Sequence, residues 1–226
     1  MMHIQSLSKS FGSKTVLNDI NISFEEGKVY GIVGENGAGK TTLFNCIAGL
    51  EGYDGRITSD HEKLKEHLGY LQTNPYFFSK ITGREYLQLC CIARGKEDIN
   101  FDSKNIFELP LDDYASIYST GMQKKLAFTA ILLQENSILI LDEPFNGVDI
   151  QSNMIITGII QQLRSIGKTI LISSHIFSTL SDTCDEIHLL RSGVFIKKAL
   201  KSEFNQLDAE MKSFIIGNKL ELLGLK

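Results

Sequence analysis

Residues 34–41, GENGAGKT, have the types and spacing of a phosphate-binding loop. Its glycines lack side chains, so consecutive backbone N–H groups can surround a phosphate chain. Lys40 supplies a positive charge for the outer phosphates, and the Thr41 hydroxyl can bind Mg²⁺. A helix that begins here would direct its positive end toward the anion. The motif predicts nucleotide binding, by residues Gly34, Glu35, Asn36, Gly37, Ala38, Gly39, Lys40, Thr41 and Thr42.

A pair of carboxylates in residues 137–144, SILILDEP, could serve a metal and a water molecule. The apolar run predicts a buried strand, and Asp142 and Glu143 stand where it ends. In phosphate-loop proteins an aspartate at such a strand end holds Mg²⁺. Glu143 lies one residue further and is placed to polarise an attacking water. We expect Asp142 to be the metal-binding acid and Glu143 the general base, whereas without the phosphate loop two solvated acids would be favoured.

Two further polar residues, His175 and Gln72, end strand-like stretches. His175 follows TILISS, a buried strand that should end at the edge where open α/β sheets gather their ligand groups. A histidine there can hydrogen-bond the γ-phosphate and the attacking water, although a lone histidine is more often a packed polar residue. Gln72 ends GYLQ, and its neutral amide could touch Mg²⁺ or water and release it easily. The alternative for Gln72 is an ordinary surface glutamine.

The elements that must position these groups alternate between strand and helix. The predicted strands are 20–24, 29–33, 55–59, 67–72, 137–142, 169–174, 186–190 and 194–198. The predicted helices are 41–49, stopped by Gly49, 152–165, closed by Gly167, and a short one near 176–183. This order predicts an α/β fold with a mostly parallel sheet covered by helices on both faces.

A region of helical character interrupts this alternation. Strand signals fade from residue 74 to residue 134, where 83–95 and 123–134 have helical spacing. We therefore predict one domain over 1–226, with a core of 1–73 and 135–200 and a helical subdomain of 74–134. The remaining residues, 201–226, form a weakly helical C-terminal tail whose role the sequence leaves open.

Composition narrows the classes of function. The chain has 226 residues and a net charge of −4, which does not favour nucleic acid as a partner. Its four cysteines lack metal-type spacing and indicate thiols in a reducing cytoplasm. The sequence contains no run of 18 apolar residues, the length that would predict a membrane span. Its first residues lack the apolar core of a secretory signal. We expect a protein that is soluble as a lone chain and that needs another chain for any work at a membrane.

The order of these motifs resembles the ATP-binding subunit of ABC transporters over nearly the whole chain. In that order come an aromatic residue, the phosphate loop, a glutamine, a signature sequence, the Asp-Glu pair, NGVD and a histidine. The resemblance implies a P-loop NTPase core, an N-terminal antiparallel β portion and a signature-bearing helical subdomain, with ATP and Mg²⁺ as cofactors. It also implies roles for single residues: Phe11 stacks on adenine, Gln72 joins Thr41 and Asp142 at the metal, His175 is the catalytic switch, and the 146–149 loop crosses to a partner with Asp149 near the nucleotide.

Residues 118–122, YSTGM, lie where the family has its Leu-Ser-Gly-Gly-Gln signature. In the family, two subunits dimerise head to tail, and the signature of one caps the ATP held by the phosphate loop of the other. The resemblance implies that Ser119 and the Gly121 N–H contact the γ-phosphate of the partner's ATP, helped by the helix dipole. Tyr118, Thr120 and Met122 depart from the family pattern. Similar S-x-G-M forms occur in the exporter-type branch, while the effect of Thr120 and Met122 on turnover stays open.

These inferences predict an ATP-hydrolysing subunit that powers a membrane transporter, in the exporter branch, through ATP-dependent dimerisation. Its partners would be an integral membrane permease and a second nucleotide-binding subunit, identical or different. It would be cytoplasmic and bound through the permease to the inner face of the cell membrane. The alternative is a soluble ABC-type ATPase in protein or cluster assembly. A GTPase lacks its guanine-reading N-K-x-D here, and a kinase leaves the signature unexplained. The substrate and the direction of transport are not encoded in these motifs.

Overall fold

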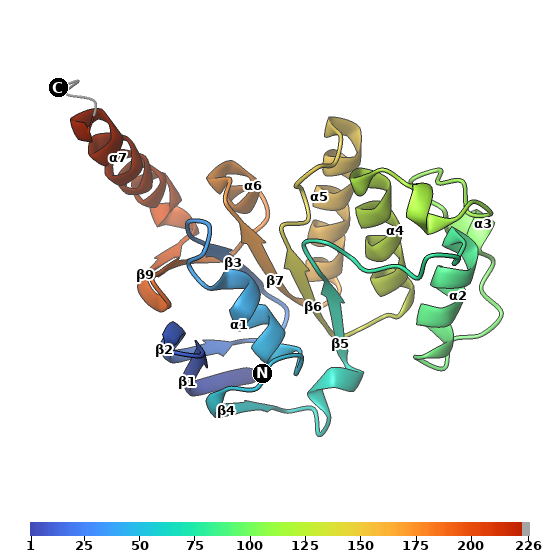
Figure 1. Ribbon diagram of the computed structural model, residues 1–226, viewed down its shortest axis with the longest axis horizontal. Coiled ribbons are helices and arrows are strands. Elements are labelled where there is room, and N and C mark those ends of the chain that lie inside the picture. The colour runs from blue at the N-terminus through green and yellow to red at the C-terminus, as the bar shows by residue number, and fades with distance from the viewer. Residues whose placement is uncertain (223–226) are drawn as a thin grey trace.

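The computed structural model describes the backbone of residues 1–222 and the side chains of residues 1–213. Its centre is a six-stranded sheet in which all strands are parallel except the last (Figure 1). In sheet order the strands are β5 (Leu68–Leu71), β6 (Ile138–Asp142), β7 (Thr169–Ser174), β3 (Val29–Val33), β8 (Glu186–Arg191) and β9 (Val194–Leu200). Every residue of β3, β6 and β7 is buried, which explains why their central residues are apolar without the alternating pattern of a half-exposed strand.

A second, antiparallel sheet has the order β2 (Lys14–Phe24), β1 (Met2–Phe11) and β4 (Asp54–Ser59). It confirms the expected N-terminal antiparallel portion. The residue pattern alone predicted only the second half of β2 and none of β1. The register of β1 against β2 shifts at three places, and Ser6 has a positive φ of 47°. Such irregularities disturb the two-residue alternation from which a strand is predicted.

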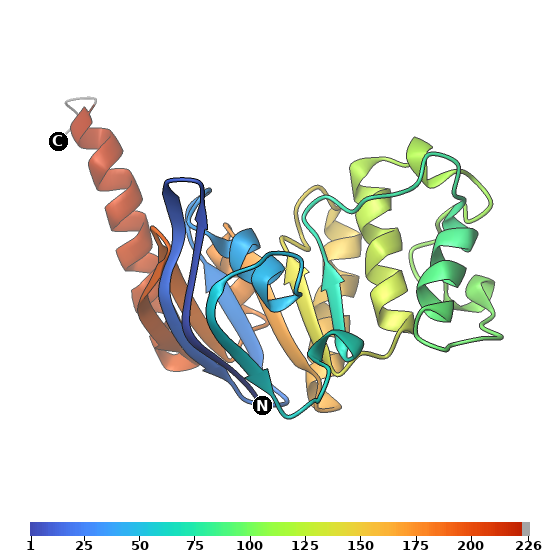
Figure 2. The same ribbon diagram turned by 60° about the horizontal axis from the view of Figure 1, so that its bottom comes forward.

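Two hydrophobic cores lie on opposite faces of the six-stranded sheet. On one face, α1 (Lys40–Ile47) packs between the two sheets, where Phe44 joins Tyr30 and Ile32 (Figure 2). On the other face, α5 (Ile150–Ser165) and the short α6 (Phe177–Ser181) pack against β7 and its neighbours. Both faces of the central strands are therefore covered, as the alternation of strand and helix predicts.

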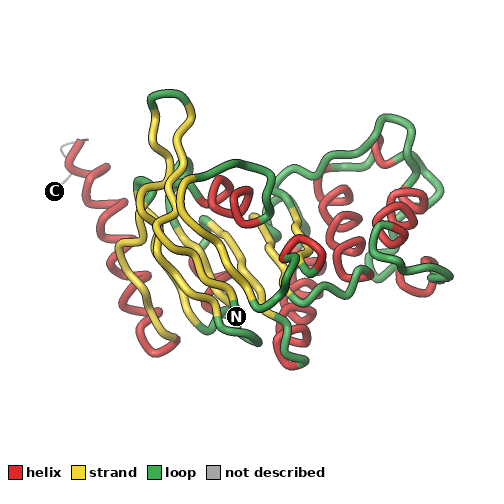
Figure 3. The backbone as a smooth tube through the Cα atoms, turned by 90° about the horizontal axis from the view of Figure 1, so that it is seen from below, coloured by secondary structure: helices red, strands yellow, loops and turns green. Residues whose placement is uncertain are grey.

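The helical subdomain forms the end of the molecule opposite the antiparallel sheet (Figure 3). It contains α2 (Gly83–Ile92), α3 (Phe101–Lys104), the 3₁₀ turn η2 (Ala115–Ile117) and α4 (Thr120–Leu133). A capping box between Thr82 and Glu85 begins α2, and the Ser119 side chain caps α4 by accepting from the Met122 N–H. Helix α4 thus begins three residues earlier than predicted, because its first turn is specified by a cap and not by apolar spacing.

The C-terminal tail contains the 3₁₀ turn η3 (Lys201–Glu203) and then α7 (Phe204–Leu222), which projects from the body of the molecule (Figure 1). The remaining 3₁₀ turn, η1 (Leu64–Glu66), precedes β5. Within the described residues, no helix combines the length and the apolar character that crossing a bilayer requires.

Candidate active site

Four neighbouring strands, β5, β6, β7 and β3, end at one edge of the sheet, and the predicted chemical groups follow them there. A cavity of about 530 Å³ lies at this edge. Its walls come from the phosphate loop and from three later segments, through Asn36, Gly37, Gly39, Lys40, Thr41, Thr42, Thr73, Glu143, Asn146 and His175, with Lys14 and Val16 of β2. The carboxyl ends of parallel strands thus form a pocket of a size suited to a small ligand.

The phosphate loop is folded tightly around its own lysine. The buried Nζ of Lys40 donates to the carbonyl oxygens of Gly34, at 2.7 Å, and Glu35, at 3.2 Å. Burial lowers the pKa of Lys40, while the carboxylates of Glu143 and Asp142 act in the opposite direction. A Cβ on Gly34 would lie 2.3 Å from a backbone oxygen of β8, so this glycine is also required by packing. The phosphate loop is therefore folded around the ammonium group of Lys40.

Asp142 is fully buried and is surrounded by hydroxyl groups. Thr41 Oγ1 and Thr73 Oγ1 each donate to its Oδ2 at 2.7 Å, and the Ser173 hydroxyl donates to its Oδ1. A carboxylate with hydroxyl oxygens is a donor set that suits Mg²⁺, which usually takes few protein ligands and completes its shell with water and phosphate. In the described part of the chain, no three His, Cys, Asp or Glu side chains gather as a metal site. A cation here would depend on Asp142, the hydroxyls and the nucleotide.

The structure brings Thr73, the residue after Gln72, to this acid. Gln72 follows β5 directly, but it is not among the residues that line the cavity, whereas Thr73 is. The hydroxyl of Thr73 donates a hydrogen bond to Asp142, the predicted metal-binding acid. The metal-binding role of Gln72 stays a prediction, and Thr73 is the alternative candidate for this role.

Glu143 and His175 face each other across the end of the sheet. His175 Nδ1 lies 2.8 Å from Glu143 Oε2, and the Glu143 carboxylate is 4.0 Å from the Lys40 amine. Glu143 has a positive φ of 52°, which is uncommon for a residue with a side chain. Its N–H donates to Ser173 Oγ at 3.0 Å, and Lys124 donates to its carbonyl oxygen at 2.7 Å. The unusual backbone directs the carboxylate to the cavity, which Glu143 lines.

Gly34, Glu35 and Ala38 of the phosphate loop line an adjoining pocket, and buried Asp142 is hydrogen-bonded to Thr41 and Thr73 of the cavity wall. Phe11, Ser119, Gly121 and Asp149, like Gln72, do not line the cavity of this chain. Phe11 is 47% exposed at the end of β1, and the Lys9 amine lies 4.5 Å from its ring centroid. Asp149 caps α5 by accepting from the N–H and hydroxyl of Ser152, both at 2.8 Å, and these bonds lower its pKa. The predicted contacts of these four residues with a nucleotide stay predictions.

Three neighbours of the predicted metal-binding and catalytic residues were not themselves predicted from the sequence: Thr73, Ser173 and Lys124. Thr73 and Ser173 stand at the ends of predicted strands, so their position at the sheet edge was available as a signal. Lys124 gave no signal, because its contact with Glu143 joins two elements 19 residues apart in the chain.

Comparison with known proteins places these features in a family. The family model described as "ABC transporter" matches residues 17–146. NatA, an ABC transporter ATP-binding protein of Bacillus subtilis, is 32% identical over 97% of this chain and 98% of its own length. A bacitracin transport ATP-binding protein of Enterococcus faecalis is 31% identical over 96% of this chain and 75% of its own. The chain therefore belongs to the ABC transporter family and is an ATP-binding ATPase of that family.

Solved structures agree with this assignment at the level of the fold. The ATP-binding subunit of an ABC transporter superposes with a TM-score of 0.80 at 24% identity, over 92% of this chain and 93% of that one. A dimeric ATP-binding cassette, in a post-hydrolysis state with ADP and phosphate, also gives a TM-score of 0.80 at 19% identity, over 89% of this chain and 99% of that one. The predicted P-loop NTPase fold with its helical subdomain is thereby confirmed.

Proposed function

We propose that this chain powers a membrane transporter of the exporter branch by binding ATP between two head-to-tail subunits and hydrolysing it. The observation that carries the proposal is the single cavity that joins the phosphate loop, Glu143 and His175. The relative named for bacitracin transport supports a transport role.

In the proposed reaction, the phosphate loop binds the triphosphate through its backbone N–H groups and the Lys40 amine. Mg²⁺, held by Thr41 and Asp142, would neutralise charge that develops on the phosphates. Glu143 accepts a proton from the attacking water, and His175 holds the Glu143 carboxylate and contacts the γ-phosphate side of the cavity. The chain thus supplies the base, its orientation and the cradle for the phosphates.

The signature segment would complete the site of a second subunit. Ser119 and Gly121 lie at the first turn of α4 and not in the cavity of their own chain, which supports a role toward a partner's nucleotide. ADP lacks the γ-phosphate that these groups would contact. Because a ligand shifts an equilibrium only by its differential contacts, hydrolysis would weaken the dimer.

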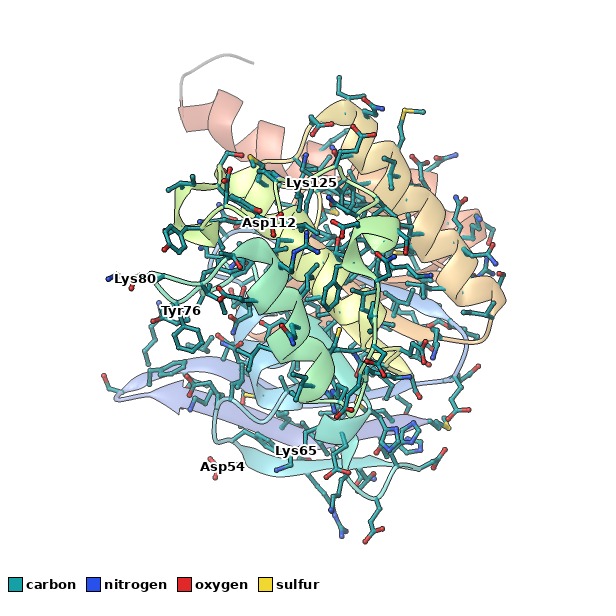
Figure 4. The ribbon with its side chains drawn as sticks, turned by 90° about the vertical axis from the view of Figure 1, so that its right-hand side faces the viewer. Asp54, Lys65, Tyr76, Lys80, Asp112 and Lys125 are labelled. Atoms are coloured by element: carbon teal, nitrogen blue, oxygen red, sulfur yellow. The ribbon has the colours of Figure 1, made fainter. Side chains whose placement is uncertain are left out.

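The helical subdomain carries the surface that we assign to the permease. Tyr76 and Ile117 are 73% and 70% exposed, and Phe78 and Tyr114 are exposed beside them in sequence. Figure 4 shows Tyr76 and Lys80 extending outward from the segment between β5 and α2. Exposed apolar and aromatic side chains of this kind mark interaction sites. Through such a contact the chain would lie on the cytoplasmic face of the cell membrane.

The deciding experiment replaces Glu143 by Gln. The variant should bind ATP, form a dimer that persists at saturating ATP, and lose turnover by roughly 10²–10⁴-fold, the usual contribution of a general base. Phosphate release measures turnover. Sedimentation of the protein with and without ATP measures dimerisation. A variant that stays monomeric at saturating ATP, or that hydrolyses it normally, contradicts the proposal.

The membrane partner is tested separately. The tagged chain, solubilised from its own cells in mild detergent, should co-purify with a polytopic membrane protein. Replacing the exposed Tyr76 by Ser should reduce that recovery while ATP turnover of the isolated chain is kept. Recovery from the cytosol alone, with no membrane protein bound, would favour the assembly ATPase instead.

A further inference from the structure

Lys124 on α4 is an unusual lysine because its side chain is only 3% exposed. Its Nζ donates to the carbonyl oxygen of Glu143 at 2.7 Å. Burial lowers the pKa of Lys124, and the carboxylates of Glu143 and Asp142 act against that shift. A buried amine is costly unless it is hydrogen-bonded. The carbonyl oxygen of Glu143 supplies this hydrogen bond to Lys124 at the edge of the sheet.

The residue that Lys124 contacts has a backbone that needs support. Glu143 has a φ of 52°, and such a conformation persists only where the surroundings hold it. Its N–H is held by Ser173 of β7, and its carbonyl oxygen accepts from Lys124 and, at 3.2 Å, from the N–H of Asn146. Of these partners, Lys124 alone comes from the helical subdomain.

Two other contacts fasten the first turns of α4 to the segment after Glu143. A Cβ on Gly121 would lie 2.5 Å from the Gly147 carbonyl oxygen, so the two backbones are pressed together. Lys125 reaches Asp149 at 3.2 Å. Lys124 therefore belongs to a part of α4 that is in direct contact with the 143–149 segment, on the same helix that begins with the signature residues.

We propose that Lys124 is a positioning residue for Glu143. Its hydrogen bond holds the left-handed backbone that directs the carboxylate to His175 and the cavity, and it links the orientation of the signature helix to the base of the same chain. The inference rests on the proposed role of Glu143 as general base. Lys124 itself is not among the residues that line the nucleotide cavity, and it reaches this cavity only through Glu143.

The first test replaces Lys124 by Met, which keeps most of the volume and removes the donor. We expect kcat to fall by about 10- to 100-fold with KM for ATP changed less than about threefold, because the transition state and not the ground state uses the oriented base. Thr129→Val is the matched control: this buried α4 hydroxyl donates to the carbonyl oxygen of Lys125 in its own helix and lies outside the nucleotide cavity, so kcat should be kept. Thermal unfolding of each variant reports whether it is folded.

A second pair of variants keeps the test decisive if Lys124→Met does not fold. Lys124→Gln retains an amide donor on a long stem, whereas Lys124→Asn has the same donor one methylene shorter. If the hydrogen bond matters, kcat of the Gln variant should exceed that of the Asn variant by about 5-fold or more, since only the longer amide approaches the Glu143 carbonyl. Equal kcat values for the two folded variants overturn the inference.

The last arm separates this inference from the proposed function. In a Glu143→Gln background, Lys124→Met should lower residual turnover no further, because residues that act through one group are non-additive. If Glu143→Gln keeps turnover, the general base is misassigned. If Glu143→Gln loses turnover but Lys124→Met does not, or if Lys124→Met lowers turnover equally in both backgrounds, only the Lys124 inference fails.

Discussion

The hydroxyl of Thr73 donates a hydrogen bond of 2.7 Å to Oδ2 of Asp142, the same oxygen that accepts from Thr41. The segment that leads into the helical subdomain is thus hydrogen-bonded to Asp142, the proposed metal-binding acid. The side chain that makes this bond, Thr73, was not identified by the order of motifs. A small hydroxyl reaches this acid directly, whereas the preceding glutamine lies outside the cavity.

Thr73→Val should weaken ATP binding only when Mg²⁺ is present. The substitution keeps the shape of the side chain and removes one hydroxyl, so we expect a loss of about 3- to 10-fold in Mg²⁺-dependent affinity, the value of a single hydrogen bond. Isothermal titration with Mg²⁺ and with EDTA measures it. The competing variant is Gln72→Ala: a Mg²⁺-dependent loss in Gln72→Ala, and none in Thr73→Val, would return the metal-sensing role to Gln72.

His175→Ala should lower kcat for ATP hydrolysis by about 10- to 100-fold and leave ATP affinity within a few-fold. The imidazole holds the Glu143 carboxylate at 2.8 Å, and orientation of a base is used mainly in the transition state. Steady-state phosphate release gives kcat and KM separately. His61→Ala is the control, since His61 stacks on His67 outside the cavity. A rise in KM without a fall in kcat would contradict a role in orienting the base.

Gly121→Ala should destabilise the fold by roughly 1–3 kcal/mol, the usual cost of overpacking. The added Cβ would lie 2.5 Å from the Gly147 carbonyl oxygen, and a backbone atom cannot easily give way. Chemical denaturation measures the free energy of unfolding. Gly158→Ala on α5 is the matched control, because its Cβ meets no atom within 4 Å and alanine favours a helix. Equal stability of the two variants would show that α4 and the 143–149 segment are not tightly packed.

Stability should fall as the pH drops from 7.5 to 5, in part because of His188. Burial lowers the pKa of His188 to about 4, although the Glu186 charge acts in the opposite direction. The unfolded chain, with an ordinary pKa near 6.5, binds the proton first, so this contribution is complete above pH 6.5 and is lost toward pH 4. The expected loss at pH 5 is about 2 kcal/mol.

Replacement of His188 by Phe tests that assignment, because a phenyl ring can keep the packing beside Tyr30 and Phe195. The free energy of unfolding of His188→Phe, measured from pH 7.5 to pH 4.5, should depend less on pH than that of the natural chain. Parallel pH profiles for the two proteins would assign the acid sensitivity to other groups.

The sequence predicts best where burial is complete. The strands at 29–33 and 169–174 have the predicted bounds, since every residue of both is buried and neither has a solvent-facing side. Strand β1 was not predicted because bulges break its alternation. The phosphate loop and the Asp142–Glu143 pair are local motifs, so their meeting at one sheet edge could be inferred from strand order.

Contacts made through space are what the sequence leaves undetermined. The choice between Gln72 and Thr73 depends on a single residue at a strand end, where successive side chains point to opposite sides. The contact between Lys124 and the Glu143 carbonyl joins a helix to a backbone atom, which no pattern of residue types reveals. The predicted roles toward a partner subunit concern surfaces that a single chain leaves exposed.

The place of β3 in the sheet has a consequence for how this protein is made. The strand that leads into the phosphate loop is hydrogen-bonded on both sides, to β7 and β8, which begin at Thr169 and Glu186. A ribosome that adds about 5–20 residues each second releases those neighbours many seconds after β3. Until then β3 lacks the strands that cover its two edges, so the sheet edge that carries the phosphate loop can form only after β8 has been synthesised.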